Sequence, residues 1–175
     1  GLTEAGCRVF LVPGESESAL PAWSERLQAP GITVFTGNEC SDPAVLEADG
    51  ERVLIYGARS TDITTAAHRT GEGCHIGLFH FDIDTIAPTE TELKPLFKSL
   101  PLDFYALGGN HAVKLYKSGM RITAAYPGSA FPASELETGD RYMLKFSVIN
   151  SRVSDIKRIA VNTRKLEHVA IEAES

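Results

Sequence analysis

Short apolar runs that end at proline or glycine constrain the fold of this chain more than any other feature of its sequence. Residues 8–12 read Arg-Val-Phe-Leu-Val and stop at a Pro-Gly pair, and residues 103–107 lead into a Gly-Gly pair. Residues 75–81, His-Ile-Gly-Leu-Phe-His-Phe, form a third run of this kind. A short continuous apolar run bounded by turn residues is typical of a strand buried on both faces. The sequence therefore predicts a sheet whose central strands are covered on each side.

Segments with helical character lie between these runs. Residues 21–27 begin with proline, which suits the first turn of a helix, and residues 61–68 follow a serine that can serve as a cap. Residues 90–100 carry leucines and a phenylalanine at helical spacing, with acidic residues early and lysines late, as the helix dipole favours. We expect three helices at these positions.

From residue 112 onward the pattern changes to antiparallel hairpins. Turn signals such as Lys117-Ser118-Gly119 and Asn150-Ser151 separate alternating segments, and Asp49-Gly50 marks an earlier hairpin. The sequence thus predicts the α/β (α+β) class, as a layered sandwich of two mixed β-sheets flanked by helices, in one domain over residues 1–175. The remaining strands are expected at 32–35, 45–47, 52–56, 112–116, 121–126, 142–148, 153–160 and 166–171.

Net charge argues against one class of partner. The 175 residues include 17 Lys and Arg against 23 Asp and Glu, a formal charge of -6. Binding to phosphates normally requires a basic excess, so we do not expect this chain alone to bind nucleic acid. No apolar run approaches the ~18–20 residues needed to span a bilayer, and no signal segment stands at the start. Three widely spaced cysteines without a C-x-x-C pair suit reduced thiols, so we expect a cytoplasmic protein with no membrane contact.

Four segments occur in one order along the chain. They are residues 9–14 (Val-Phe-Leu-Val-Pro-Gly), 76–80 (Ile-Gly-Leu-Phe-His), 102–111 (Leu-Asp-Phe-Tyr-Ala-Leu-Gly-Gly-Asn-His), and 126–129 (Tyr-Pro-Gly-Ser) followed by Glu137. In order and spacing they resemble the calcineurin-like metallophosphoesterases, in particular the branch of DNA-repair exonucleases. The resemblance covers most of the chain.

This resemblance implies a metallo-dependent phosphatase-like fold and a particular chemistry. In the family, Asp, His and Asn side chains at the carboxyl ends of buried strands hold two metal ions about 3.5–4 Å apart. The ions activate the attacking hydroxide and stabilise the transition state. The opening Asp-x-His and Gly-Asp motifs of the family would precede Val9, so the resemblance implies that the N-terminal part of the family fold is missing here.

The first motif departs from the family at its chemically important positions. The Gly-Asn-His-Asp motif falls on Gly14, Glu15, Ser16 and Glu17. The asparagine that bridges metal and phosphate is replaced by Glu15. The histidine that donates a proton to the leaving group is replaced by Ser16, which cannot do so near neutral pH. We therefore expect no catalytic residue in this motif.

The other histidine positions are only partly retained. His80 matches the isolated ligand histidine, while the Gly-His-x-His motif has Gly109 in place of its first histidine and His111 at its second. One interpretation is a weakened site for a single Mn or Zn ion, formed by His80 and His111 with Glu15, Glu17 or Asp82. The other is that both imidazoles are relics that hydrogen-bond in a polar pocket, with no cofactor. The motif relics are Gly14, Ser16, Gly108, Gly109 and Asn110.

The remaining histidines are not expected to take part in such a site. His75 precedes His80 by an odd number of residues, which places it on the opposite face of the strand. We expect it to serve packing. His68 and His168 are expected at the surface.

The replacement of the proton-donating histidine by Ser16 and of a ligand histidine by Gly109 favours a non-catalytic metallophosphoesterase-like domain, acting as a scaffold or regulatory unit. The alternative is a divergent metal-dependent phosphodiesterase or nuclease, completed by an upstream segment or a partner chain. A third hypothesis, a small-ligand or anion-binding domain, is disfavoured because Glu15 and Glu17 would repel phosphate. The missing first strands would expose sheet edges and an apolar face, so we expect a homodimer or a partner subunit to cover them.

Overall fold

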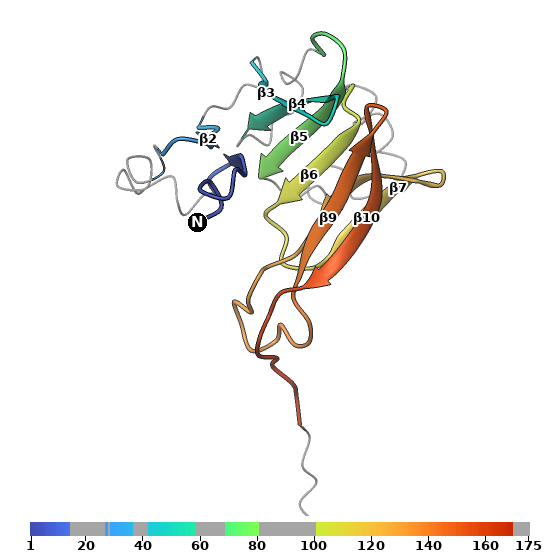
Figure 1. The fold of residues 1–175 in the computed structure, drawn as a ribbon. Coiled ribbons are helices and arrows are strands. Elements are labelled where there is room, and N and C mark those ends of the chain that lie inside the picture. Colours follow the sequence, from blue (N-terminus) through green and yellow to red (C-terminus); the bar gives the residue numbers. More distant parts are fainter. Residues whose placement is uncertain (15–26, 28, 37–41, 59–68, 81–100, 170–175) are drawn as a thin grey trace, which may run out of the picture.

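Ten β-strands form the regular secondary structure of the part of the chain that is described (Figure 1). The computed structural model describes residues 1–14, 27, 29–36, 42–58, 69–80 and 101–169. The predicted strands up to residue 160 are confirmed, with ends that shift by at most two residues. In chain order they are β1 (Val9–Leu11), β2 (Ile32–Val34), β3 (Ala44–Ala48), β4 (Glu51–Ala58), β5 (Cys74–His80), β6 (Phe104–Gly108), β7 (Lys114–Ser118), β8 (Arg121–Tyr126), β9 (Tyr142–Ile149) and β10 (Arg152–Ala160).

Six of these strands form one mixed sheet in the order β3-β4-β5-β6-β8-β7. The four inner strands are parallel, and β3 and β7 pair antiparallel at the two edges. Ile76 of β5 lies opposite Phe104 of β6, and His80 lies opposite Gly108. Because β5 and β6 run in the same direction, they end side by side. The residues that follow them therefore share one edge of the sheet.

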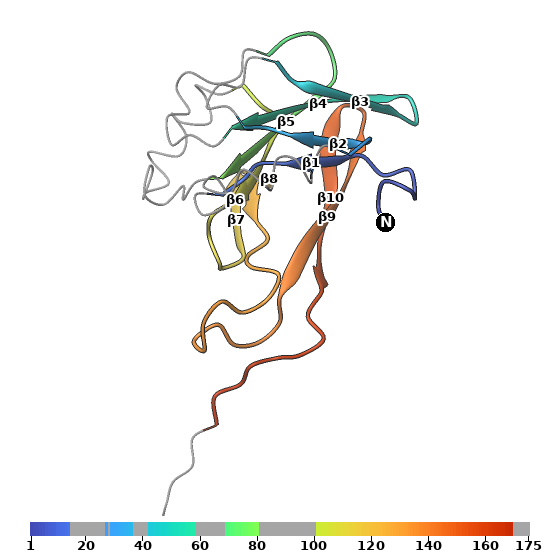
Figure 2. The ribbon, with the colours of Figure 1, turned by 90° about the vertical axis from the view of Figure 1, so that its left-hand side faces the viewer.

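The β9–β10 hairpin forms a second layer over this sheet (Figures 1 and 2). Side chains alternate along β9, so that Leu144, Phe146 and Val148 face the sheet and pack on its core. The rings of Phe104 and Phe146 meet with centroids 5.2 Å apart. Burial of these apolar side chains, at about 25 cal/mol per Å² of area, holds the two layers together.

One carboxylate ties the turn of the hairpin to the sheet. Glu51, the first residue of β4, accepts hydrogen bonds from the backbone N–H groups of Asn150 at 2.6 Å and Ser151 at 2.9 Å. Both turn residues have positive φ, 52° and 56°, as the two central residues of a type I′ turn require. The turn therefore presents two N–H groups to a single acceptor.

A short parallel pair, β1 and β2, lies beside the main sheet (Figure 2). Phe10 of β1 stacks with Phe35, which follows β2, with ring centroids 6.5 Å apart. Phe35 also packs on the bare backbone of Gly57 in β4, where an added Cβ would lie 2.1 Å from the ring. Glycine at position 57 thus allows the β1–β2 pair to approach the sheet.

His75 is fully buried and part of a polar network, which confirms its expected packing role. Its Nδ1 lies 2.9 Å from the Tyr56 hydroxyl, and its Nε2 lies 3.3 Å from the Gly71 carbonyl oxygen. Its backbone N–H donates to Asp103 at 2.9 Å. Burial, followed by the nearby Arg69 charge, lowers the pKa of His75 below its ordinary value. The folded state therefore favours the neutral form of the His75 imidazole.

The predicted α/β sandwich flanked by helices is wrong, because the described part of the chain is all-β with mixed sheets. The segments expected to be helical, 21–27, 61–68 and 90–100, lie outside the described residues apart from Leu27. Apolar runs show that the faces of a sheet must be covered, but they do not show whether helices or further strands cover them. Here an antiparallel hairpin covers one face. Within the described ranges, no helix is long and apolar enough to cross a membrane.

The strand expected at 166–171 is also not found among its described residues, 166–169. The segment instead follows the loop before β9, where the Gly139 N–H donates to the Leu166 carbonyl oxygen at 3.0 Å. Val169 is 79% exposed and Leu166 is 41% exposed, so neither apolar side chain marks a buried face. This part of the chain runs away from the two layers (Figure 1).

Candidate functional site

The two retained histidines of the sequence lie at the end of β5 and just after the neighbouring strand β6. His80 ends β5 and is partly exposed, and it lies against Gly108, where an added Cβ would sit 3.4 Å from the His80 Cδ2. Gly109 follows with φ of 101°, a conformation that residues with a side chain rarely adopt. The chain then turns through Asn110, whose side-chain oxygen accepts the Ala112 N–H at 3.0 Å, and reaches His111.

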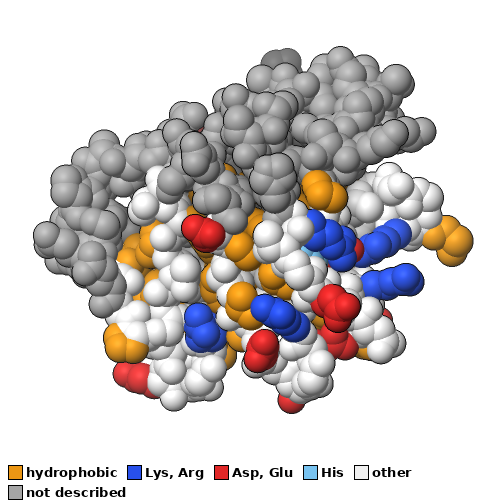
Figure 3. Space-filling view, turned by 90° about the horizontal axis from the view of Figure 1, so that it is seen from above, with side chains coloured by type: hydrophobic (Ala, Val, Ile, Leu, Met, Phe, Trp, Pro, Cys, Tyr) orange, Lys and Arg blue, Asp and Glu red, His pale blue; other side chains and the backbone are white. Residues whose placement is uncertain are grey.

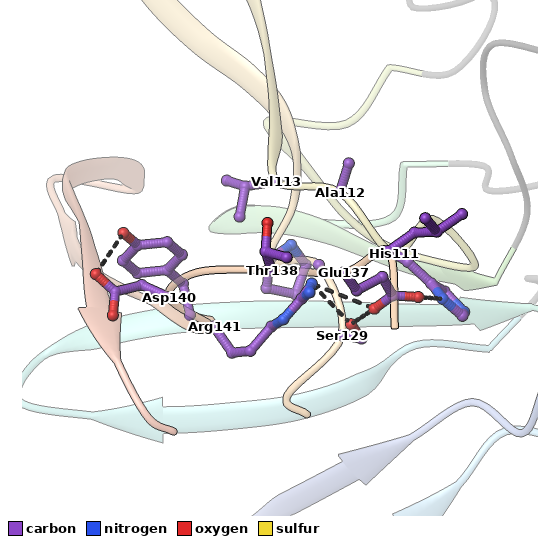
Figure 4. A pocket seen from close by; sticks show the side chains of 12 residues that line it. His111, Ala112, Val113, Ser129, Glu137, Thr138, Asp140 and Arg141 are labelled. Carbon is purple, nitrogen blue, oxygen red and sulfur yellow. Dashed lines mark hydrogen bonds and ion pairs between the residues drawn. The ribbon is translucent and has the colours of Figure 1, made fainter. Parts of the chain in front are cut away.

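A cavity of about 400 Å³ lies beside His111, between the loop after β6 and the loop that leads into β9 (Figure 4). Polar and apolar side chains share its walls, with Leu136 and Tyr142 among the apolar ones. The polar groups that line it come from His111, Ser129, Glu137, Thr138, Asp140 and Arg141.

Glu137 is the centre of the hydrogen bonds in this cavity (Figure 4). Its Oε1 lies 2.8 Å from the Nδ1 of His111, and its Oε2 accepts the Ser129 hydroxyl at 2.9 Å. The Ala133 N–H, at 3.3 Å, and one guanidinium nitrogen of Arg141, at 3.3 Å, also reach Oε2. The hydrogen bonds from His111 and then from Ser129 lower the pKa of Glu137 to about 2. Glu137 is therefore a carboxylate at neutral pH, and its donors come from three loops or strand ends.

Arg141 is the most deeply buried charge of the site, with a side chain only 9% exposed. It donates to the Ser129 hydroxyl oxygen at 3.3 Å as well as to Glu137. Its backbone is held on both sides, because its N–H donates to the Asn162 side chain at 2.8 Å and its carbonyl accepts the Val161 N–H at 2.9 Å. Its buried Nε has no hydrogen-bond partner among the described residues. The Arg141–Glu137 pair therefore holds the loop before β9 in place.

The His111 imidazole is the exposed member of the cluster, with a side chain 61% exposed. Since its Nδ1 is directed at Glu137, Nε2 is the ring nitrogen that remains open to another group. A histidine oriented by a carboxylate in this way can serve as a metal ligand or a general base. The cluster is not a nucleophile triad, because the Ser129 hydroxyl donates to Glu137 and not to an imidazole.

The described residues include only part of the predicted site. His80, the last residue of β5, and His111, three residues after β6, lie toward the same edge of the sheet, but they line different cavities. Gly14 is buried in the loop after β1, while Glu15, Ser16, Glu17 and Asp82 lie outside the described residues. Across the described ranges, no three His, Cys, Asp or Glu side chains gather in a group that could hold a metal ion.

Sequence reasoning missed Glu137 and Arg141 as site residues and treated Ser129 as structural. These residues lie within one segment, four to twelve positions apart, which is a usable signal for a local polar cluster. Their link to His111 crosses 26 positions and becomes visible only in three dimensions.

Comparison with known proteins identifies a fold but no family. No family model and no curated protein matches the chain. Among solved structures, it is similar to the crystal structure of a hypothetical protein from Thermus thermophilus, with a TM-score of 0.56 and 11% identity. The match covers 95% of this chain and 79% of that one. At this identity the likeness indicates a shared fold alone.

Proposed function

We propose that this chain is a non-catalytic metallophosphoesterase-like domain, related to DNA-repair exonucleases, that acts as a scaffold or regulatory unit. The proposal is supported by parallel strands β5 and β6 that end side by side; one retained histidine, His80, is the last residue of β5, and the other, His111, lies three residues after β6. The carboxyl edge of parallel strands is where ligands usually bind in sheets of this kind.

The observation that carries the proposal is the backbone at Gly109. The family has a metal-ligating histidine at this position, whereas here φ is 101°. A side chain at such a φ costs on the order of 1–3 kcal/mol of strain. A histidine at position 109 would therefore be strained in this backbone conformation. Restoring histidine at this one position is not expected to restore a metal site.

A resident two-metal centre does not fit the described donors. The His111 imidazole is hydrogen-bonded to Glu137 through Nδ1, and the described part of the chain holds no group of three possible ligands. We propose that the domain works without a cofactor. A single Mn or Zn ion bound weakly at His80 and His111 is the alternative form of the site.

We further propose a cytoplasmic protein that forms a homodimer, with a distinct partner subunit as the alternative. Support comes from an apolar groove of about 470 Å³ beside β1, lined by side chains such as Phe10, Phe79 and Phe146. These side chains are buried or half-buried, so the groove is a recess that an apolar side chain of a second copy can fill. Sedimentation velocity at micromolar concentration should detect a dimer, and a monodisperse monomer would contradict it.

Hydrolysis of bis-p-nitrophenyl phosphate in the presence of Mn²⁺ tests the main proposal. The wild-type chain, His80→Ala and Gly109→His should all give the rate of the metal-only blank. Metal analysis of the same purified samples should find less than one equivalent of Mn or Zn. Mn²⁺-dependent hydrolysis that His80→Ala abolishes would refute the proposal and favour the divergent phosphodiesterase or nuclease.

A further inference from the structure

The β9–β10 hairpin has a second side, which faces away from the sheet. Successive side chains of a strand point to opposite faces, and directly paired residues of neighbouring strands point to the same face. The residues of β9 that alternate with its packed side chains therefore project outward together with their partners on β10. We call this surface the outer hairpin face; it consists of the pairs Met143–Ile159, Lys145–Lys157, Ser147–Ser154 and Ile149–Arg152.

All charged groups of the outer hairpin face are cations. Lys145 and Lys157 lie directly opposite each other, and both are exposed. Like charges in directly paired positions destabilise a sheet. No described residue forms an ion pair with Lys145, Lys157 or Arg152, and Asp155, in the adjacent bulge, pairs with neither lysine. A chain with a net charge of -6 thus keeps an unneutralised positive surface here, whereas Lys and Arg lie beside Asp and Glu on the face seen from above in Figure 3.

Exposed apolar side chains accompany these cations. Met143 is 48% exposed and Ile149 is 51% exposed, at opposite ends of β9. Surfaces that contact nucleic-acid phosphates are built from cationic and hydrogen-bonding groups. Met143 and Ile149 flank the lysine pair, and their exposed apolar area gains from burial against apolar side chains, which a phosphate backbone does not offer. The combination favours a protein partner over a nucleic acid.

Self-association through this face is disfavoured. In a two-fold dimer the same patch is present on both sides of the interface. Lysines and an arginine would then face the identical cations of the second copy, and juxtaposed like charges oppose association. The partner must therefore bring negative charge.

We propose that the outer hairpin face binds an acidic, partly apolar segment of a protein partner. Carboxylates of the partner lie beside Lys145 and Lys157 and relieve their mutual repulsion. Aliphatic side chains of the partner cover Met143 and Ile149. This surface is separate from the site at His111, so the inference goes beyond the proposed function and does not depend on the loss of catalysis.

Fluorescence anisotropy with a synthetic peptide tests the proposal. The probe is a fluorescein-labelled peptide with the repeat Ile-Ser-Glu-Ser. It should bind the wild-type chain saturably, and more weakly at high salt. The double variant Lys145→Glu/Lys157→Glu should weaken binding by about tenfold or more, because the attraction is replaced by repulsion. A matched control, Lys117→Glu/Arg164→Glu, changes the net charge equally away from this face and should weaken binding less than about twofold.

A second measurement separates binding from folding. Lys157→Glu alone turns the like-charged pair into an opposite pair, so it should raise the melting temperature while it weakens peptide binding. The absence of saturable binding to the wild type, or equal weakening by the control variant, would overturn the proposal. Tighter binding of a thymidine oligonucleotide than of the peptide would also overturn it and indicate a nucleic-acid surface.

Discussion

Replacing Tyr56 with phenylalanine removes one oxygen atom from a fully buried network and leaves the packing volume almost unchanged. Tyr56 and His75 are both 0% exposed, and the hydroxyl lies 2.9 Å from the His75 Nδ1. The Gly71 carbonyl beside Nε2 can only accept, so Nε2 carries the ring proton and Nδ1 accepts from Tyr56. In Tyr56→Phe the buried Nδ1 therefore loses its donor.

The expected loss follows from that unsatisfied nitrogen. A buried acceptor left without its partner costs about 1–3 kcal/mol. The Thr70 N–H loses a longer contact to the same hydroxyl, at 3.4 Å, which adds little. For a chain of this size, each kcal/mol lowers the melting temperature by about 2–4 °C. We expect the free energy of unfolding of Tyr56→Phe to fall by about 1–3 kcal/mol.

Urea denaturation at pH 8, followed by circular dichroism, measures this loss directly. Tyr142→Phe is the matched control, because the Tyr142 hydroxyl makes one long bond, 3.4 Å, to a carboxylate at the partly exposed Asp140. Its loss should stay within about 0.5 kcal/mol. If Tyr56→Phe costs no more than Tyr142→Phe, with unchanged m-values, the assigned hydrogen bond does not stabilise the fold and the reasoning fails.

Four further outcomes are expected. Glu51→Ala removes the acceptor of two turn N–H groups and should cost about 1–2 kcal/mol in urea denaturation, whereas Glu47→Ala, at an exposed position, should cost less than about 0.5 kcal/mol. Ser151→Gly relieves a positive φ and should raise stability by up to about 1 kcal/mol, seen as a higher urea midpoint. Because the folded state lowers the pKa of His75, the unfolded chain binds its proton more readily, so stability should fall as the pH drops below 6.5, and His75→Phe should flatten this slope. The pKa of Glu137 is lowered to about 2 from 4.5, so its stabilising contribution is present above pH 4.5 and lost toward pH 2; the melting temperatures of wild type and Glu137→Gln should converge as the pH falls through this range.

The strands could be predicted because their signals are local. The turn at Asp49 and Gly50 has φ of 51° and 77°, and such positive values are what an Asp-Gly pair supplies at low cost. The same argument found the Asn150 turn, whose φ is 52°. Between the turns, apolar alternation marks which side of each strand is buried. These features act over a few residues and are visible in the sequence.

The arrangement of the layers could not be predicted in the same way. Strand β8 lies between β6 and β7 although it follows both in the chain. The residues around Tyr105 contain no signal that Tyr105 pairs with Ala124 of β8. The covering layer was expected to be helical, yet within the described part the β9–β10 hairpin covers one face of the sheet. Pairing and layering depend on contacts between distant segments, which single-sequence patterns do not encode.

The same distinction between local signals and distant contacts applies to the candidate site. The family resemblance implied that His80 and His111 lie at the carboxyl ends of buried strands, and β5 and β6 are parallel and end at one edge of the sheet. What His111 does there depends on Glu137, which lies 2.8 Å from its Nδ1 and is itself held by Ser129 and Arg141. A motif can therefore locate an imidazole. The hydrogen bond at Nδ1 then decides whether the ring is held with Nε2 directed outward or is free to rotate. In this chain the partly buried Glu137–Arg141 ion pair, in a loop distant in sequence, provides that orientation and makes His111 part of a hydrogen-bonded polar cluster.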